Sequence, residues 1–134
     1  MTSSKSGLLD TSVLIGFEAA RPLNRDLLPD SLVVSVVTLA ELRAGVLAAS
    51  DVAVQARRIG TLERAQRIAQ LPVDQHVAAA WAAMRVQIGR AGRRVNINDL
   101  WIAATAAVHE LPVYTQDEDF DAIAAIGGVT VIMV

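Results

Sequence analysis

Apolar and polar residues follow two recurring patterns along this chain, one typical of strands and one typical of helices. Short apolar runs rich in β-branched residues predict strands at 7–10, 31–35, 112–115 and 129–132, and a short strand or crossing at 71–73. Longer segments with apolar residues at helical spacing predict helices at 13–18, 39–49, 51–70, 75–89, 99–109 and 118–125. Strands that alternate with helices predict an α/β fold with a central, mostly parallel sheet.

Polar residues at the starts of these helical segments are candidate helix caps. Thr38 is followed three residues later by Glu41, the spacing of a capping box. The other expected caps are Thr11 and Ser12, Asp51, and Asn98 or Asp99. No repeat or linker divides the chain, so we expect one domain over residues 1–134, with residues 1–6 as a flexible tail.

Four acidic residues border apolar runs, where a carboxylate is costly unless it is paired, hydrogen-bonded or bound to metal. They are Asp10, Glu41, Asp99 and Asp117. Asp10 and Asp117 follow predicted strands, and ligands of parallel sheets bind beyond the carboxyl ends of strands. Glu41 and Asp99 are expected in first helical turns, where the helix dipole favours negative charge. We therefore expect one shared acidic pocket.

An all-oxygen pocket of this kind suits Mg²⁺ or Mn²⁺, and four carboxylates can hold one or two ions. The corresponding reaction is metal-dependent hydrolysis of phosphodiesters. Three of the acids also have a simpler interpretation: Glu41 as a capping-box partner, Asp99 as an N-cap, and Asp117 as part of a solvated acidic stretch. Asp10 fits such an interpretation less well, because it directly follows a predicted buried strand. The joint occurrence of all of them favours the metal pocket.

Composition limits the kinds of site, compartment and partner that the chain can have. The chain has no cysteine, which excludes disulfides, thiolate zinc sites and cysteine nucleophiles, and which fits a cytoplasmic protein. No apolar run approaches the ~20 residues that cross a bilayer, so we expect no membrane partner. A hydrophobic fraction of 53% and a mean hydropathy of +0.41 suggest a buried partner surface.

The formal net charge of −2 does not indicate a nucleic-acid partner, but arginine is unevenly distributed. Eleven of the twelve basic residues are arginine, and arginine binds phosphate bidentately. A solvated helix face is the commoner role of any single arginine. The candidates for guiding RNA phosphates are Arg43, Arg85, Arg90, Arg93 and Arg94.

Four segments together resemble the ordered motifs of PIN domains, and the resemblance spans essentially the whole chain. The segments are Leu8–Ile15, Thr38–Gly45, Asn98–Ala106 and Val113–Phe120. Short stand-alone PIN domains of this type are similar to VapC toxins of bacterial toxin–antitoxin pairs. The resemblance implies an RNase-H-like three-layer α/β/α sandwich and an endoribonuclease that depends on Mg²⁺ or Mn²⁺.

The resemblance also implies roles for individual residues. Asp10, Glu41, Asp99 and Asp117 match the acidic tetrad of the family. Asp10, Asp99 and Asp117 are expected to hold the metal directly and Glu41 directly or through water. Asp119 lies beside the fourth position and is expected to assist Asp117 or substitute for it. Thr115 matches the small hydroxyl residue of the last motif. Hydroxyl groups of Thr11, Ser12 and Thr115 are expected to hydrogen-bond a ligating carboxylate.

The family further implies a homodimer and a cognate VapB-type antitoxin, which often aims an arginine into the acidic pocket. Two alternatives to a toxin ribonuclease remain. One is a catalytically silent PIN-like interaction module. The other is a receiver-like signalling domain. Such a domain needs a lysine near its acidic pocket, but the only lysine here is Lys5, in the polar segment at the start of the chain.

Overall fold

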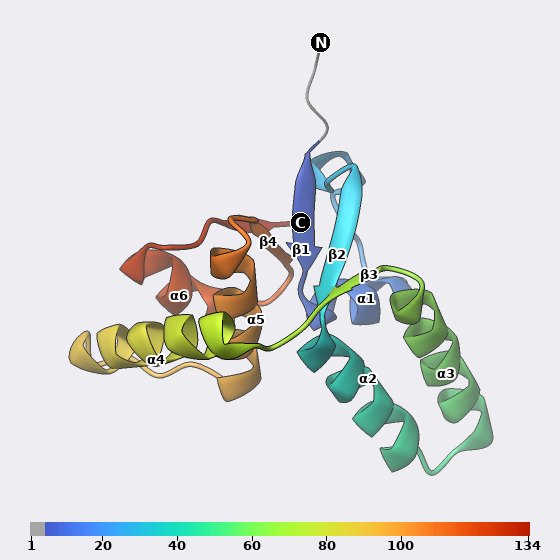
Figure 1. Ribbon diagram of the computed structural model, residues 1–134. Coiled ribbons are helices and arrows are strands. Elements are labelled where there is room, and N and C mark those ends of the chain that lie inside the picture. The colour runs from blue at the N-terminus through green and yellow to red at the C-terminus, as the bar shows by residue number, and fades with distance from the viewer. Residues whose placement is uncertain (1–4) are drawn as a thin grey trace.

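A parallel five-stranded sheet forms the centre of the protein (Figure 1). The computed structural model describes residues 5–134. The strands are β1 (Ser6–Leu9), β2 (Ser31–Ser35), β3 (Ala69–Leu71), β4 (Val113–Thr115) and β5 (Val131–Met133). Their order across the sheet is β3-β2-β1-β4-β5, and every neighbouring pair is parallel.

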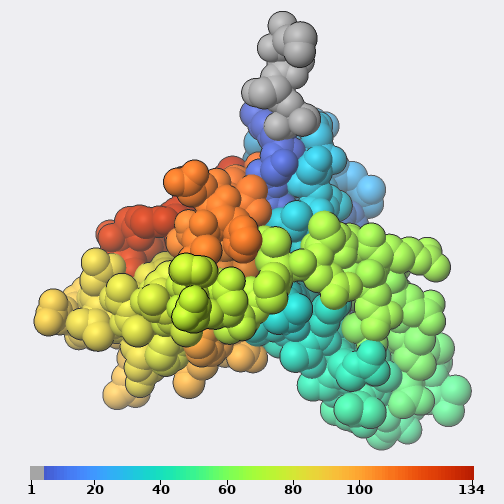
Figure 2. All heavy atoms as spheres, in the orientation of Figure 1, coloured from blue at the N-terminus to red at the C-terminus, as the bar shows by residue number. Residues whose placement is uncertain are grey.

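Helices cover both faces of this sheet, which confirms the predicted three-layer α/β/α sandwich. The helices are α1 (Thr11–Glu18), α2 (Val36–Ala48), α3 (Val52–Gln66), α4 (Gln75–Arg90), α5 (Ile97–Val108) and α6 (Asp121–Ile126). Two 3₁₀ helices, η1 (Arg25–Leu27) and η2 (Glu118–Phe120), lie in the connections. The α2–α3 pair projects away from the sheet as a separate arm (Figure 2).

Successive residues of β1 serve two separate cores because side chains of a strand alternate between its faces. Leu8 is fully buried in the core formed with α4, α5 and α6, where Phe120 is the largest fully buried side chain. Leu9 packs on the opposite face with α1 and α3. Alanines on α5, such as Ala103, are also fully buried and allow the helix to lie close to the sheet.

Two predicted caps are wrong, at α1 and α2. Asp10 itself caps α1 by accepting from the amide of Ser12, so Thr11 and Ser12 fall inside the helix. Ser35 caps α2, which therefore begins at Val36 and not at 39. The capping box at Thr38 does not form, because its hydroxyl is buried against Thr11.

The expected cap at the start of α5 is also wrong. Asn96 is the N-cap, and its side-chain oxygen accepts from the amides of Asn98 and Asp99. Asp99 therefore lies in the first turn, as expected, with its carboxylate available for other contacts. The prediction for Asp51 is confirmed, since its carboxylate accepts from the amide of Val54.

Three predicted strand boundaries also need correction, and one of them is β5, which covers Val131–Met133 and not 129–132. Helix α3 ends at Gln66 and β3 covers Ala69–Leu71, not 71–73, because this edge strand is mostly exposed and carries little apolar signal. Ser6 belongs to β1, so the predicted tail over 1–6 is too long; residues 1–4 lie outside the described residues. No helix in the described part of the chain has the length and apolar run that crossing a bilayer requires.

Candidate metal centre

The sheet order itself creates the site. Strands β2 and β3 lie on one side of β1, and β4 and β5 lie on the other, so the order reverses between β1 and β4. Parallel sheets bind ligands at such a point, beyond the carboxyl ends of the strands. Asp10 directly follows β1, and Asp117 comes two residues after the end of β4. Residues over 100 positions apart in the chain thus meet at one edge.

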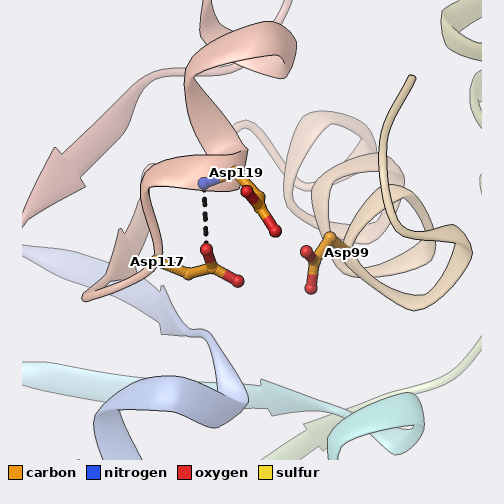
Figure 3. A group of neighbouring side chains, drawn as sticks. All are labelled: Asp99, Asp117 and Asp119. Carbon is orange, nitrogen blue, oxygen red and sulfur yellow. Dashed lines mark hydrogen bonds between the residues drawn. The ribbon is translucent and has the colours of Figure 1, made fainter.

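Three carboxylates converge beyond this edge (Figure 3). Asp99, Asp117 and Asp119 each offer an oxygen, and these oxygens lie within 4.8 Å of one another. Asp99 comes from the first turn of α5, while Asp117 and Asp119 come from the loop and 3₁₀ helix after β4. Asp10 and Glu41 are not part of this close group, although both lie near enough for their charges to act on Asp99.

Burial and like charge both act on Asp99, which is only 8% exposed. Burial is the larger cause and, together with the charges of the neighbouring acids, raises the pKa of Asp99 from 3.8 to about 7. The neighbouring acids that contribute are Asp10, Asp117, Glu41 and Asp119, in decreasing order. The tetrad predicted from the sequence therefore shares one electrostatic environment, and Asp119 belongs to it.

Hydroxyl groups hold the carboxylate of Asp10 in place. Oδ2 accepts from the hydroxyls of Ser12 (2.6 Å) and Thr115 (2.9 Å), and from the amide of Ser12 (3.3 Å). All three of these hydrogen bonds end on Oδ2 and none of them on Oδ1. Burial raises the pKa of Asp10, and the hydrogen bonds from Ser12 and Thr115 oppose that rise. One oxygen is thus fixed by the protein and the other is left for a ligand.

The other acids are held by similar contacts. The hydroxyl of Thr11 donates to Oε1 of Glu41 at 2.7 Å and also forms a hydrogen bond with the hydroxyl of Thr38 at 3.0 Å. Glu41 is the sixth residue of α2, so the expectation that it lies in the first turn is wrong. It reaches the site because Thr38 and Glu41, three residues apart, share the helix face toward α1.

Hydrogen bonds fix the loop after β4 at both of its ends. The amide of Asp117 donates to the Thr115 hydroxyl, and the amide of Asp119 donates to Oδ1 of Asp117, both at 2.9 Å. The side-chain amide of Gln116 donates to the carbonyl of Pro22 at 2.9 Å, and its backbone amide donates to the Ser12 hydroxyl. Sequence reasoning missed this supporting role of Gln116, because its partners are distant in the chain.

The residues present fit a hard divalent cation. All the candidate ligands are carboxylate oxygens, which Mg²⁺ and Mn²⁺ prefer. Among the described residues, no arginine or lysine donates a hydrogen bond to these acids, so their negative charge is uncompensated. Buried like charges of this kind are stable only when protonated or when a cation joins them.

The predicted RNA-binding arginines do not share one position. Arg43 is exposed on α2, whereas Arg85 and Arg90 lie on α4. Arg93 and Arg94 follow in the connection to α5. The structure therefore separates Arg43 from the other four.

Comparisons with known proteins agree with this geometry. Residues 7–126 match the model of the PIN domain family. The chain is 50% identical to Ribonuclease VapC5 of Mycobacterium tuberculosis, over 99% of this chain and 98% of the relative. It is 44% identical to Ribonuclease VapC4 of the same organism, over 95% and 98%.

A solved structure is similar as well. It is the crystal structure of VapBC-5 from Mycobacterium tuberculosis, a member of the VapBC family of toxin–antitoxin systems. The superposition has a TM-score of 0.89 at 49% identity and covers 96% of this chain and 98% of that chain.

Proposed function

Since this chain belongs to the PIN domain family and resembles its VapC ribonucleases along nearly its full length, we propose that it is the toxin of a type II toxin–antitoxin pair, an endoribonuclease that depends on a divalent metal ion. One observation carries the proposal: acids from four separate segments of the chain converge at the sheet edge where β1 and β4 end. The VapC relatives are named ribonucleases. We propose that the enzyme acts in the cytoplasm, where cellular RNA is available.

In this proposal Asp99, Asp117 and Asp119 hold Mg²⁺ or Mn²⁺, as one or two ions, with Asp10 and Glu41 completing the set of ligands. When bound, such an ion supplies positive charge to the phosphoryl oxygens and makes a nearby water molecule more acidic. The closeness of the three aspartate oxygens supports the assignment, and so does the free Oδ1 of Asp10.

The residues around the acids orient them. Ser12 and Thr115 fix the rotamer of Asp10 by donating to one oxygen, so the other keeps a constant direction. Thr11 does the same for Glu41, whose second oxygen is left to orient water or accept a proton. Hydrolysis adds water across one phosphorus–oxygen bond, and the ribose oxygen leaves with a proton. Positioning of this kind is a major part of catalysis in phosphoryl transfer.

A hollow beside the site supports the antitoxin as a partner. It has a volume of about 220 Å³ and lies between α1, α2 and α3. Ile15 and Leu42 give it apolar walls, and its two carboxylates, Glu18 and Glu41, outnumber its one guanidinium, Arg58. We propose that a VapB-type antitoxin inserts apolar side chains and an arginine here.

We also propose that the free toxin is a homodimer. Light scattering of the free and complexed protein tests the oligomeric state.

The test of the enzymatic proposal is RNA cleavage with Mg²⁺ or Mn²⁺, compared with cleavage in EDTA. Asp10→Asn and Asp99→Asn are expected to lower the rate at least about 100-fold, since each removes a ligand charge. Asp26→Asn, in the exposed 3₁₀ helix η1, is the matched control and is expected to cleave as the wild type does. Retained cleavage in both site variants would refute the mechanism.

The two alternatives are weaker. A receiver-like domain wants a lysine beside its acids, but Lys5 precedes β1 and therefore lies at the opposite end of that strand from Asp10. A catalytically silent module would not need the uncompensated acid group that this chain has kept. Failure to bind Mn²⁺ in calorimetry, together with absence of cleavage, would favour that module.

A further inference from the structure

A second hollow, between α4 and the start of α5, is lined by arginine. Its volume is about 380 Å³. Arg85 of α4 and Arg93 and Arg94 of the α4–α5 connection line it, and the remaining lining residues are apolar or glycine. No acid lines it, whereas the two hollows at α1 and α3 that contain Arg57 or Arg58 each include Glu18. Another acid-free hollow has two arginines, Arg25 and Arg64, where this one has three. We refer to it as the arginine hollow.

The end of α4 explains how the arginines come together. Gly92 adopts a φ of +71°, which is favourable only for glycine, and reverses the chain after the helix. The amide of Arg93 donates to the carbonyl of Ile88 at 3.1 Å, and the amide of Gly92 donates to the carbonyl of Gly89 at 3.0 Å. This pair of bonds is a Schellman motif. It folds Arg93 and Arg94 back toward Arg85.

Arg85 is held in place by stacking. Its guanidinium lies over the ring of Trp81 at 5.4 Å from the centroid. Trp81 in turn stacks on Trp101 of α5, with ring centroids 4.7 Å apart and planes 15° from parallel. A cation stacked on an aromatic face loses less freedom when it binds an anion. Arg85 is therefore oriented before any ligand arrives.

The arginine hollow and the metal centre share the first turn of α5. Ile97 and Leu100 line the hollow, and Asp99, between them in sequence, faces Asp117 and Asp119. Residues three apart share one face of a helix, and Asp99 projects from a neighbouring face. A helix with its side chains is about 10–12 Å across, so a short stretch of RNA strand spans the two places.

We propose that the arginine hollow binds a backbone phosphate of the RNA substrate, a few nucleotides from the phosphodiester at the acids. This rests on the proposed ribonuclease function. Guanidinium groups bind phosphate bidentately, and an acid-free hollow with three of them attracts an anion without competition from protein carboxylates. Binding at a distance from the cleaved bond anchors the strand, since phosphate contacts fix register and orientation.

The experiment measures binding of a fluorescently labelled single-stranded oligoribonucleotide by anisotropy, in EDTA and over a range of salt concentrations. Arg93→Gln/Arg94→Gln is expected to weaken binding about tenfold at low salt. The slope of log affinity against log salt is expected to fall by about 0.7 for each phosphate that the variant no longer neutralises. Because cleavage is no part of this measurement, it gives an answer even if the proposed nuclease activity fails.

A matched control distinguishes an effect of the arginine hollow on RNA binding from an effect of overall charge. Arg57→Gln/Arg67→Gln removes the same charge from exposed positions on α3 and at its end, and is expected to bind RNA like the wild type. Equal loss of affinity in both double variants would overturn the proposal, and so would wild-type affinity in the Arg93/Arg94 variant. A loss of antitoxin affinity with RNA affinity unchanged would assign the hollow to the protein partner and also overturn it.

Gly89→Glu tests the same hollow without removing an arginine. Gly89 lines the hollow, and a Cβ added there meets nothing within 4 Å. Glutamate favours a helix more than glycine, so the thermal midpoint is expected not to fall. The added carboxylate is expected to weaken RNA binding as strongly as the double variant. A folded Gly89→Glu protein with unchanged affinity would contradict the assignment.

Discussion

Asn in place of Asp99 should stabilise the metal-free protein while abolishing its response to metal. Asp99 is 8% exposed, and no hydrogen bond to its carboxylate is present in residues 5–134. Its charge faces four other acids, which with burial raise the pKa from 3.8 to about 7. An amide of the same shape carries no charge and can donate to a neighbouring carboxylate. The substitution therefore removes repulsion at little cost in packing.

The sign and size of this change in the free energy of unfolding follow from proton linkage. Between pH 4 and 7 the folded protein binds the Asp99 proton more tightly than the unfolded chain, so the free energy of unfolding falls as pH rises through this range. A rise of about three pKa units at about 1.4 kcal/mol each gives an upper limit of about 4 kcal/mol. Water and salt screen the open edge of the site, so we expect about 2 kcal/mol.

Urea unfolding followed by far-ultraviolet circular dichroism, in EDTA at pH 4 and pH 8, measures this effect. At pH 8 the Asp99→Asn protein should exceed the wild type by about 2 kcal/mol, and at pH 4 the two should nearly coincide. Mn²⁺ should then raise the stability of the wild type only. Asp26→Asn, on the exposed helix η1, should match the wild type throughout. An Asp99→Asn protein no more stable than the wild type at pH 8 would refute the electrostatic reasoning.

Three further substitutions test neighbouring contacts. Thr115→Val removes a donor to Asp10 and should weaken Mn²⁺ binding about tenfold in calorimetry; unchanged affinity would mean that the hydroxyl does not orient the ligand. Gly16→Ala would place a Cβ against the side-chain oxygen of Gln116, whose side-chain amide is held by the carbonyl of Pro22, and should cost about 1–3 kcal/mol in urea unfolding, so a neutral result would contradict this close packing. Gly60→Ala, where a Cβ meets nothing within 4 Å, should instead stabilise α3 by about 0.5–1 kcal/mol, and a loss of stability would show that the helix needs glycine there.

The fold was predictable because its strands and most helices carry strong local patterns. Val33 and Val34 in β2, and the buried stripe of Val77, Met84 and Ile88 in α4, lie where their spacing indicates. The exposed edge strand β3 has few apolar residues, and its position was wrong by two residues. Ala69, Gln70 and Leu71 include no β-branched residue, so a local pattern gives no strand signal there.

The convergence of the acids could be predicted from the sequence, but the contacts that support them could not. Asp10 and Asp117 follow strand ends, so the sheet topology alone brings them together. Thr38 was predicted to be a cap because a rule based on neighbouring residues cannot detect its partner Thr11, 27 residues away. The arginine hollow likewise depends on the backbone reversal at Gly92, which sets where the next side chains point.

The pairing of the first strand with the fourth has a consequence for synthesis of the toxin. The hydrogen bond from Thr115 to Asp10 joins residues 105 positions apart, so Asp10 leaves the ribosome well before β4 and η2 do. A nascent chain that lacks them has neither Asp117 nor Asp119 and cannot assemble the centre. In the ribonuclease that we propose, the acids therefore come together only after β4 and η2 have been synthesised and β4 has paired with β1.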